Sequence, residues 1–141
     1  MVTLNPYLNF GGNCEAAFEF YRSVFGGQFA DVQRFSAMPP DSGVAPEDAQ
    51  RLMHIALPIG PNGVLMGSDR LASMGPITAG DNYHLSLQTD DEAEATRLFN
   101  GLAAGGQVIM PLAPTFWNAR FGMLIDQFGV QWMINQAQAP Q

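Results

Sequence analysis

The sequence predicts an α+β fold in which a βαβββ unit occurs twice. The two units are expected to join into one cup-shaped mixed sheet with the helices on its convex side. The first observation is that the stretch from Tyr83 to Gln107 reads like a second copy of the stretch from Asn5 to Gln28. Each copy opens with alternating apolar and polar residues, as a half-buried strand does. Each continues into apolar residues at helical spacing, and three strand-like runs complete each half.

The first half begins with the alternating strand YLNF, in which Leu8 and Phe10 form the apolar side. Asn13 is a suitable N-cap for the helix that CEAAFEFY begins, because its side chain can accept a hydrogen bond from a free backbone N–H. The predicted buried face of this helix consists of Ala17, Phe20, Tyr21 and Val24. Gly26 and Gly27 end the helix, since glycine readily adopts the left-handed conformation that follows a last turn. The remaining strands are FADVQRFSA, LMHIALPI and GVLMGSD.

The second half begins with HLSLQT, whose polar side consists of His84, Ser86 and Gln88. Asp90 is the candidate N-cap of the helix that DEAEATRLF begins, and acidic residues follow in the first turn, where the helix dipole favours them. The same GGQ sequence that ends the first helix ends this one. Its predicted buried face consists of Ala95, Leu98, Phe99 and Leu102. The remaining strands are QVIMPLA, RFGMLIDQ and VQWMINQ.

The length and composition predict one globular domain. We expect a single domain over 1–141, with repeat one at about 1–69, a linker at about 70–82 and repeat two at about 83–137. The N-terminus lacks a signal peptide's basic and apolar regions, and no apolar run approaches membrane-spanning length, so we expect a cytoplasmic protein without a membrane partner. The net charge of −7 and the six scattered basic residues argue against a nucleic-acid partner.

The chain contains two histidines, and both are candidate catalytic residues. If Met53, Ile55 and Leu57 of LMHIALPI pack on a helix, His54 points into the cup. His84 points the same way at the start of the second repeat. Neutral imidazole can bind a metal or act as a general acid or base near pH 7. The alternative is a histidine that is hydrogen-bonded within a polar sheet face.

A ligand pocket is predicted on the polar sides of the first strands of the two repeats. Tyr7 lies on this side in the first repeat, and Ser86 and Gln88 lie on it in the second. Three methionines in other strands are core residues by default, but on the cup face they would form an adaptable apolar pocket. These methionines are Met66, Met123 and Met133, of which Met133 is included among the predicted pocket residues.

Aromatic residues gather in the turn region PTFWNARFG. Trp117 is flanked by Phe116 and Phe121, and such a cluster suits the apolar wall of a ligand pocket. The same cluster also suits a core or dimer-interface anchor, and both interpretations stay open. Trp132 alternates with polar neighbours in VQWMINQ and is expected to pack on a helix.

The single cysteine, Cys14, cannot form an internal disulfide. It lies early in the first predicted helix, where the helix N-terminus can lower a thiol pKa and raise its reactivity. The alternative is a small, semi-buried apolar residue without a chemical role, and we favour that interpretation.

Several longer motifs occur in order along nearly the whole chain: PYLNFGGNCEAAFEFYRSVFGG, MHIALPI, LMGSD and TFWNARFGMLIDQFGVQWMIN. With the duplicated βαβββ pattern, they resemble the vicinal oxygen chelate superfamily, which includes glyoxalase I, extradiol dioxygenases and bleomycin resistance proteins. The PhnB-like branch is the more specific resemblance. It implies a glyoxalase/bleomycin resistance-like fold and a homodimer that binds a small molecule in its concave cup.

The resemblance also implies four positions at which metal-using members place His, Glu or Gln. His84 occupies the position at the start of the second repeat, whereas Asn5 stands at the start of the first. Met133 stands where the last strand usually has an acid, and Asp69 lies two residues beyond the fourth position, Gly67. A catalytic zinc normally has three protein ligands, so His84 and Asp69 form an incomplete candidate set for a divalent metal.

Three classes of function remain open. The first is a non-catalytic small-molecule binder, which we rank first because the metal-ligand set is depleted. The second is a divalent-metal-dependent lyase, isomerase or dioxygenase of the vicinal oxygen chelate type. The third is metal-free acid–base catalysis by the two histidines. PhnB-like sequences are often labelled methyltransferases, but we disfavour that activity because the chain lacks a glycine-rich cofactor loop.

Overall fold

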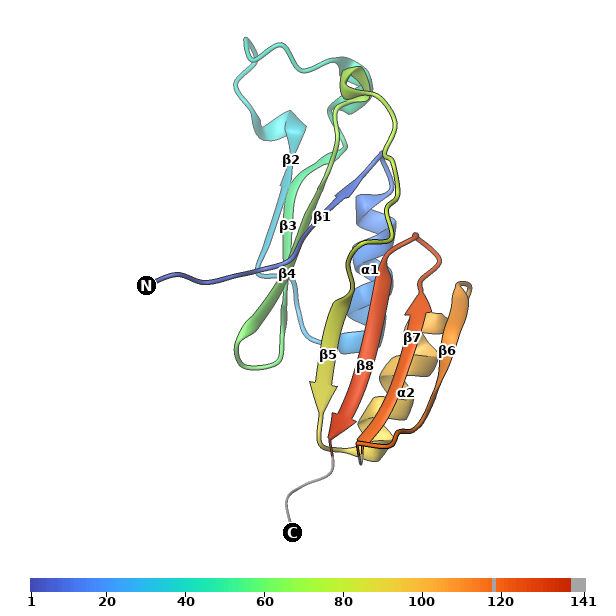
Figure 1. Cartoon of the computed structure of the whole chain (residues 1–141). Coiled ribbons are helices and arrows are strands. Elements are labelled where there is room, and N and C mark those ends of the chain that lie inside the picture. The colour runs from blue at the N-terminus through green and yellow to red at the C-terminus, as the bar shows by residue number, and fades with distance from the viewer. Residues whose placement is uncertain (118, 138–141) are drawn as a thin grey trace. The chain divides into compact units, whose positions relative to one another are not determined.

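The computed structural model describes residues 1–117 and 119–137, and the chain divides into two compact units. Unit 1 is Met1–Thr78 and unit 2 is Ala79–Gln141, with the boundary inside the predicted linker. Unit 1 contains β1 (Tyr7–Phe10), α1 (Cys14–Phe25), β2 (Asp31–Arg34), β3 (Leu52–Ile59) and β4 (Gly63–Asp69). Unit 2 contains β5 (Leu85–Thr89), α2 (Glu92–Ala103), β6 (Gln107–Pro114), β7 (Ala119–Ile125) and β8 (Gln131–Ala137). Each unit is therefore one βαβββ set (Figure 1).

The two sheets have the same topology. Unit 1 has the strand order β1-β4-β3-β2, and unit 2 has the equivalent order β5-β8-β7-β6. In each sheet the first strand pairs in parallel with the last, while the other neighbours are antiparallel. One helix lies against one face of each sheet. The predicted α+β class with tandem βαβββ units is confirmed.

The core of unit 1 forms between α1 and the sheet. The buried side chains of α1 are Cys14, Ala17, Phe18, Tyr21 and Val24. The prediction was wrong at one position, because Phe18 is fully buried whereas Phe20 is only half-buried. The Phe18 ring packs edge-on against Phe10 and Tyr21, with centroids 6.3 and 5.5 Å apart. Gly67 of β4 makes room for it, since an added Cβ there would lie 2.7 Å from the Phe18 ring.

The core of unit 2 follows the prediction. The buried face of α2 consists of Ala95, Leu98, Phe99 and Leu102. Gly122 of β7 leaves space for the Phe99 ring, because an added Cβ would lie 2.7 Å from it. Trp132 is buried on the helix side of β8, as expected, and its Nε1–H donates to Asp126 Oδ2 at 2.9 Å. The buried indole N–H thereby has an acceptor, as a buried polar group requires.

The helix starts differ from the prediction in their side-chain hydrogen bonds. Asn13 occupies the N-cap position of α1, but its side chain makes no capping hydrogen bond. In α2 the N-cap is Asp91, whose Oδ1 accepts from Ala93 N–H at 3.2 Å, so the assignment to Asp90 was wrong by one residue. The reason is local, since Asp91 N–H donates to Thr89 Oγ1 and this turn directs the Asp91 carboxylate toward the helix.

The second strand of the first repeat is shorter than predicted. Of the run FADVQRFSA, only Asp31–Arg34 forms the strand β2. Its pairing with β3 shifts register between Gln33 and Arg34, near the end of the strand. Phe35–Ala37 then forms a 3₁₀ turn. Both α-helices have twelve residues. In the described part of the chain, no helix has the length and apolar character needed to cross a membrane.

Candidate functional site

The open face of the unit 1 sheet, which we define as the face opposite α1, carries polar side chains. Tyr7 and Asn9 of β1 are exposed on it, because Leu8 and Phe10 alternate with them and are buried. The strand register aligns one row of side chains across the sheet: Tyr7, Met66, Ala56 and Asp31. The next row contains two register pairs, Asn9 with Ser68 and Gln33 with His54.

His54 lies at the centre of a chain of polar contacts on this face. Its Nδ1 is 3.1 Å from Tyr7 Oη, and the two rings stack with centroids 5.7 Å apart. Its Nε2 is 3.9 Å from Asp31 Oδ2. The Gln33 side-chain amide donates to the other carboxylate oxygen, Asp31 Oδ1, at 3.3 Å. The predicted position of His54 on the open face therefore agrees with the structure, which also gives it partners on two other strands, Tyr7 on β1 and Asp31 on β2.

Sequence reasoning missed two members of this chain, Asp31 and Gln33. Both lie in the predicted strand FADVQRFSA, and their spacing of two residues places them on one strand face. That alternation was a usable signal. The pairing of β2 with β3, which brings Asp31 to His54, is a contact between distant segments that the sequence pattern does not encode.

The open face of unit 2, opposite α2, is more apolar. Its strand register aligns Ser86, Met133, Met123 and Met110, which we call the methionine row. A neighbouring row contains Gln88, Asn135, Phe121 and Ala113. The predicted pocket residues Ser86, Gln88 and Met133 thus share one face. Met66, Met123 and Met133 are half-buried on open faces, so of the two interpretations of these methionines their positions agree with the cup face and not with the core.

The predicted aromatic cluster lies in the turn between β6 and β7. Phe116 is 96% exposed and Trp117 is 52% exposed. Their rings meet edge-on with centroids 4.8 Å apart, and Trp117 is 6.0 Å from the Phe121 ring. The exposure excludes a core role within unit 2. Phe121 connects the turn to the open face, so the pocket-wall and dimer-interface interpretations both stay open.

His84 directly precedes β5 and is half-buried. It lies outside the paired residues of β5, so its predicted place beside Ser86 and Gln88 stays a prediction. Within either unit, the side chains of residues 1–117 and 119–137 contain no group of three His, Cys, Asp or Glu that could hold a metal ion. The catalytic and metal-binding roles of His84 stay predictions.

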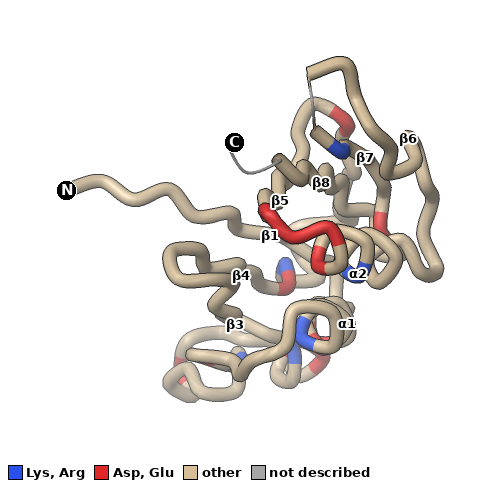
Figure 2. Tube along the Cα trace, turned by 90° about the horizontal axis from the view of Figure 1, so that it is seen from below, with Lys and Arg blue, Asp and Glu red and all other residues tan. Residues whose placement is uncertain are grey.

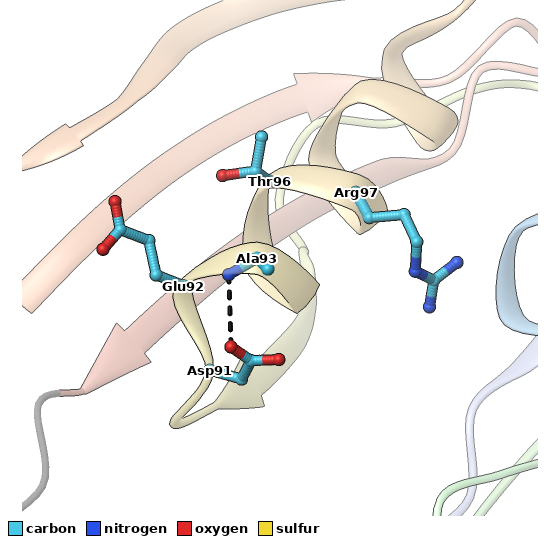
Figure 3. Close-up of a pocket in the computed structure, with 5 residues that line it drawn as sticks. All are labelled: Asp91, Glu92, Ala93, Thr96 and Arg97. Atoms are coloured by element: carbon cyan, nitrogen blue, oxygen red, sulfur yellow. Dashed lines mark hydrogen bonds between the residues drawn. The ribbon is translucent and has the colours of Figure 1, made fainter.

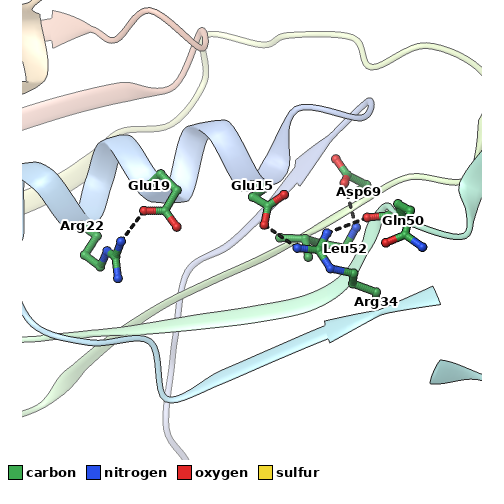
Figure 4. A network of polar contacts seen from close by, with 7 residues as sticks. All are labelled: Glu15, Glu19, Arg22, Arg34, Gln50, Leu52 and Asp69. Atoms are coloured by element: carbon green, nitrogen blue, oxygen red, sulfur yellow. Dashed lines mark hydrogen bonds and ion pairs between the residues drawn. The ribbon is translucent and has the colours of Figure 1, made fainter. Parts of the chain in front are cut away.

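Asp69 has a different environment from the other candidates, because it lies at the end of β4 on the buried side of the sheet. Its side chain is 4% exposed. Oδ1 accepts hydrogen bonds from Gly12 N–H at 2.9 Å and Cys14 N–H at 3.0 Å. Oδ2 accepts a hydrogen bond from Leu52 N–H at 2.9 Å, which Figure 4 shows. Both oxygens are thus committed to the start of α1 and of β3. These contacts give no support to the predicted role of Asp69 as a metal ligand, and that role stays a prediction.

Cys14 is completely buried at the first turn of α1. Burial raises the pKa of its thiol, and the negative charges of Asp69 and Glu15 raise it further. These effects outweigh the helix N-terminus, which would lower the pKa. The inert interpretation of Cys14 is the one that this environment favours.

We therefore expect the Cys14 thiol of the folded protein to react slowly with 5,5′-dithiobis(2-nitrobenzoate) at pH 8. Labelling should be at least about 100-fold slower than in 6 M guanidinium chloride, because it must wait for opening of the fold. The raised pKa keeps the folded thiol protonated, so its contribution to stability is present at neutral pH and is lost as the pH rises above the unfolded-state value. Labelling of the native protein at the unfolded rate would show that Cys14 is accessible.

An open depression lies at the N-terminal end of α2 (Figure 3). The residues that line it are Asp91, Glu92, Ala93, Thr96 and Arg97. Acidic residues gather where β5 leads into this helix (Figure 2). The Asp91 carboxylate already caps the Ala93 N–H, and the acidic first turn is what the helix dipole favours. We assign no ligand to this depression.

The sequence model of the Glyoxalase/Bleomycin resistance protein/Dioxygenase superfamily matches residues 3–134. The chain belongs to this superfamily. The duplicated βαβββ fold and the predicted resemblance are thereby confirmed together.

Within the glyoxalase/bleomycin resistance superfamily, the chain is similar to Protein YjdN of Escherichia coli, with 33% identity over 142 residues that cover 95% of each chain. Among solved structures it is similar to protein PA1353 from Pseudomonas aeruginosa. That match has 42% identity and a TM-score of 0.86, and it covers 99% of this chain and 100% of the other. A PhnB protein from Bacillus cereus has the same fold, with 24% identity, a TM-score of 0.77, and coverage of 96% and 100%.

Proposed function

We propose that the protein binds a small organic molecule on the open face of the unit 2 sheet. The methionine row carries this proposal, because it places three flexible apolar side chains side by side on the face opposite α2. Met133 and Met123 are half-buried, and Met110 is 47% exposed. Exposed apolar side chains grouped in this way indicate a binding surface, and methionine adapts its shape to different ligands.

The polar residues beside the methionine row indicate the kind of ligand. Ser86 stands at one end of the row, and Gln88 and Asn135 stand opposite each other in the next. These side chains can donate or accept hydrogen bonds but carry no charge. We therefore expect a largely apolar, uncharged molecule whose few polar groups determine its orientation.

We also propose that the protein acts as a homodimer. Val108, Ile109 and Met110 of β6 are each nearly half exposed, and the exposed Phe116 and Trp117 follow in the next turn. An apolar surface of this kind is unfavourable in water and supports an interface with a second copy. Membership of the superfamily supports the same assembly. The cytoplasmic location remains an expectation from the sequence.

Nile red, an uncharged apolar dye, tests the binding proposal. We expect saturable fluorescence enhancement with the wild-type protein, and at least about tenfold weaker binding by the Met133→Lys variant, because an ammonium group would be desolvated beneath the dye. Sedimentation of the same samples shows whether the binding species is the dimer. The matched control is Met74→Lys, since Met74 is 64% exposed and lies in unit 1. Equal dye affinity in the two variants would refute a ligand site at the methionine row.

A further inference from the structure

The four side chains Gln33, Asp31, His54 and Tyr7 form a connected set on the open face of unit 1, and the binding proposal for unit 2 does not use them. Four side chains are connected in sequence by contacts of 3.3, 3.9 and 3.1 Å. Tyr7 reaches His54 across β4, which lies between their strands in the sheet. The Tyr7 hydroxyl, the His54 imidazole and the Asp31 carboxylate follow one another in this order. A hydroxyl beside a base that is oriented by a third group is the arrangement that activates a nucleophile.

The proton positions follow from the two sides of the imidazole. The Asp31 carboxylate lies on the Nε2 side, and its charge favours a proton on that nitrogen. Nδ1 is then unprotonated and accepts the hydrogen bond from the Tyr7 hydroxyl. The Gln33 amide holds Asp31 Oδ1 and leaves Oδ2 directed at His54. In this tautomer of neutral His54, the acceptor nitrogen lies 3.1 Å from the Tyr7 oxygen.

The accessibility of these groups argues for a reaction with a ligand and not for a purely structural role. Tyr7 is 43% exposed. The His54 and Asp31 side chains are 29% and 45% exposed. Polar contacts at such exposure contribute little to stability, because water competes for both partners.

We propose that Tyr7, His54 and Asp31 form a metal-free acyl-transfer centre whose substrates are small carboxylic esters. The Tyr7 oxygen attacks the ester carbonyl carbon while its proton passes to His54 Nδ1. The bond between the acyl carbon and the alkoxy oxygen breaks, and the alcohol leaves with the proton from His54. Water then attacks the acyl-tyrosine with His54 as base, so the acid is released and the Tyr7 hydroxyl is restored.

Two neighbours on the same face suit the oxyanion of this reaction. Asn9 and Ser68 form a register pair in the row next to Tyr7, and they contribute an amide and a hydroxyl that can donate hydrogen bonds. The uncharged Met66 and Ala56 lie between Tyr7 and Asp31 in the register row and can contact the acyl group. The centre uses only unit 1, so its test is independent of the methionine row.

4-Nitrophenyl acetate tests the proposal, because it reports release of 4-nitrophenolate and leaves an acetyl group that peptide mass spectrometry locates. We expect acetylation of Tyr7 at least about tenfold faster than that of Tyr83. Tyr83 is a matched internal control, since it is 37% exposed and its hydroxyl accepts from Gln131 N–H instead of meeting an imidazole. The burst of 4-nitrophenolate should persist in Tyr83→Phe and disappear in Tyr7→Phe.

The role of His54 as the base is tested with His54→Ala, which should reduce Tyr7 acetylation to the rate of Tyr83. Asp31 is a positioning residue, so Asp31→Asn should lower the rate of Tyr7 acetylation several-fold, and the conservative Asp31→Glu variant, which keeps the carboxylate, should restore part of that rate. Circular dichroism and the melting temperature establish that each variant is folded. Equal acetylation of Tyr7 and Tyr83 in the wild type, or a Tyr7 rate unaffected by His54→Ala, would overturn the proposal.

Discussion

Asp69→Ala is expected to lower the free energy of unfolding by about 4 kcal/mol or more. The carboxylate is buried and accepts three backbone hydrogen bonds, from Gly12, Cys14 and Leu52. Alanine leaves these three N–H groups without an acceptor. Those of Cys14 and Leu52 are buried, and each buried unsatisfied donor costs roughly 1–3 kcal/mol. Domains of this size are stable by only about 5–15 kcal/mol, so the variant should be close to unfolding.

Urea unfolding followed by circular dichroism measures this effect, and the presence of EDTA excludes any contribution from metal binding. Asp69→Asn keeps one oxygen that can serve the two donors at Oδ1, so it should lose about half as much stability. The matched control is Asp41→Ala, because Asp41 is exposed and its removal should change stability by less than about 0.5 kcal/mol. A loss below about 1 kcal/mol in Asp69→Ala would show that the buried carboxylate does not organise this part of unit 1.

Gly106→Ala is expected to cost about 3 kcal/mol or more in unit 2. An added Cβ would collide with the carbonyl oxygen of Ile125 and would lie 2.9 Å from both Cα and the carbonyl carbon of Asp126. These are backbone atoms, and the Asp126 carboxylate holds its turn through hydrogen bonds to Phe128 N–H, Val130 N–H and Trp132 Nε1–H. The turn therefore cannot move aside without breaking buried contacts, and overpacking is correspondingly expensive.

Thermal unfolding of each variant measures the loss of stability. Alanine substitutions at two other glycines, Gly27 and Gly11, are the controls. Gly27 stands at the same place in the first GGQ sequence but has nothing within 4 Å of an added Cβ and a φ of +82°. Gly27→Ala should therefore cost only about 1–2 kcal/mol, from the left-handed backbone alone. Gly11→Ala should be near neutral, because its nearest atom, Ile77 Cγ1, is 3.6 Å away. If Gly106→Ala is no worse than Gly27→Ala, the packing against the Asp126 turn is looser than the structure indicates.

The two GGQ sequences illustrate which features the sequence predicts. Both mark the end of a helix, and that expectation holds because α1 ends at Phe25 and α2 ends at Ala103. Gly27 is required for its backbone conformation, whereas Gly106 is required for space against another segment. The first requirement is local, but the second depends on the hairpin between β7 and β8. The same residue type therefore occupies equivalent positions in the two repeats for different physical reasons.

The sequence predicted which sheet face the candidate site residues lie on, but it did not predict which side chains contact one another. Alternation in LMHIALPI placed His54 on the open side, and alternation in HLSLQT placed Ser86 and Gln88 together. The partners of His54 come from β1 and β2, and their approach depends on the pairing of four strands. Asp69 shows the same limit, since its position on a strand did not reveal that three backbone N–H groups would converge on it.

The duplicated βαβββ order could be predicted from the sequence, and so could the bounds of β3 and β4. These features follow from periodicity, which each segment carries within its own few residues. Three other features arise only in the folded chain: Met123 and Met133 lie on an open face, Phe18 takes the place of Phe20 in the core, and Asp31 reaches His54. Such outcomes depend on strand register and on which side of a sheet the helix covers. Both are set by contacts between segments that are far apart in the chain.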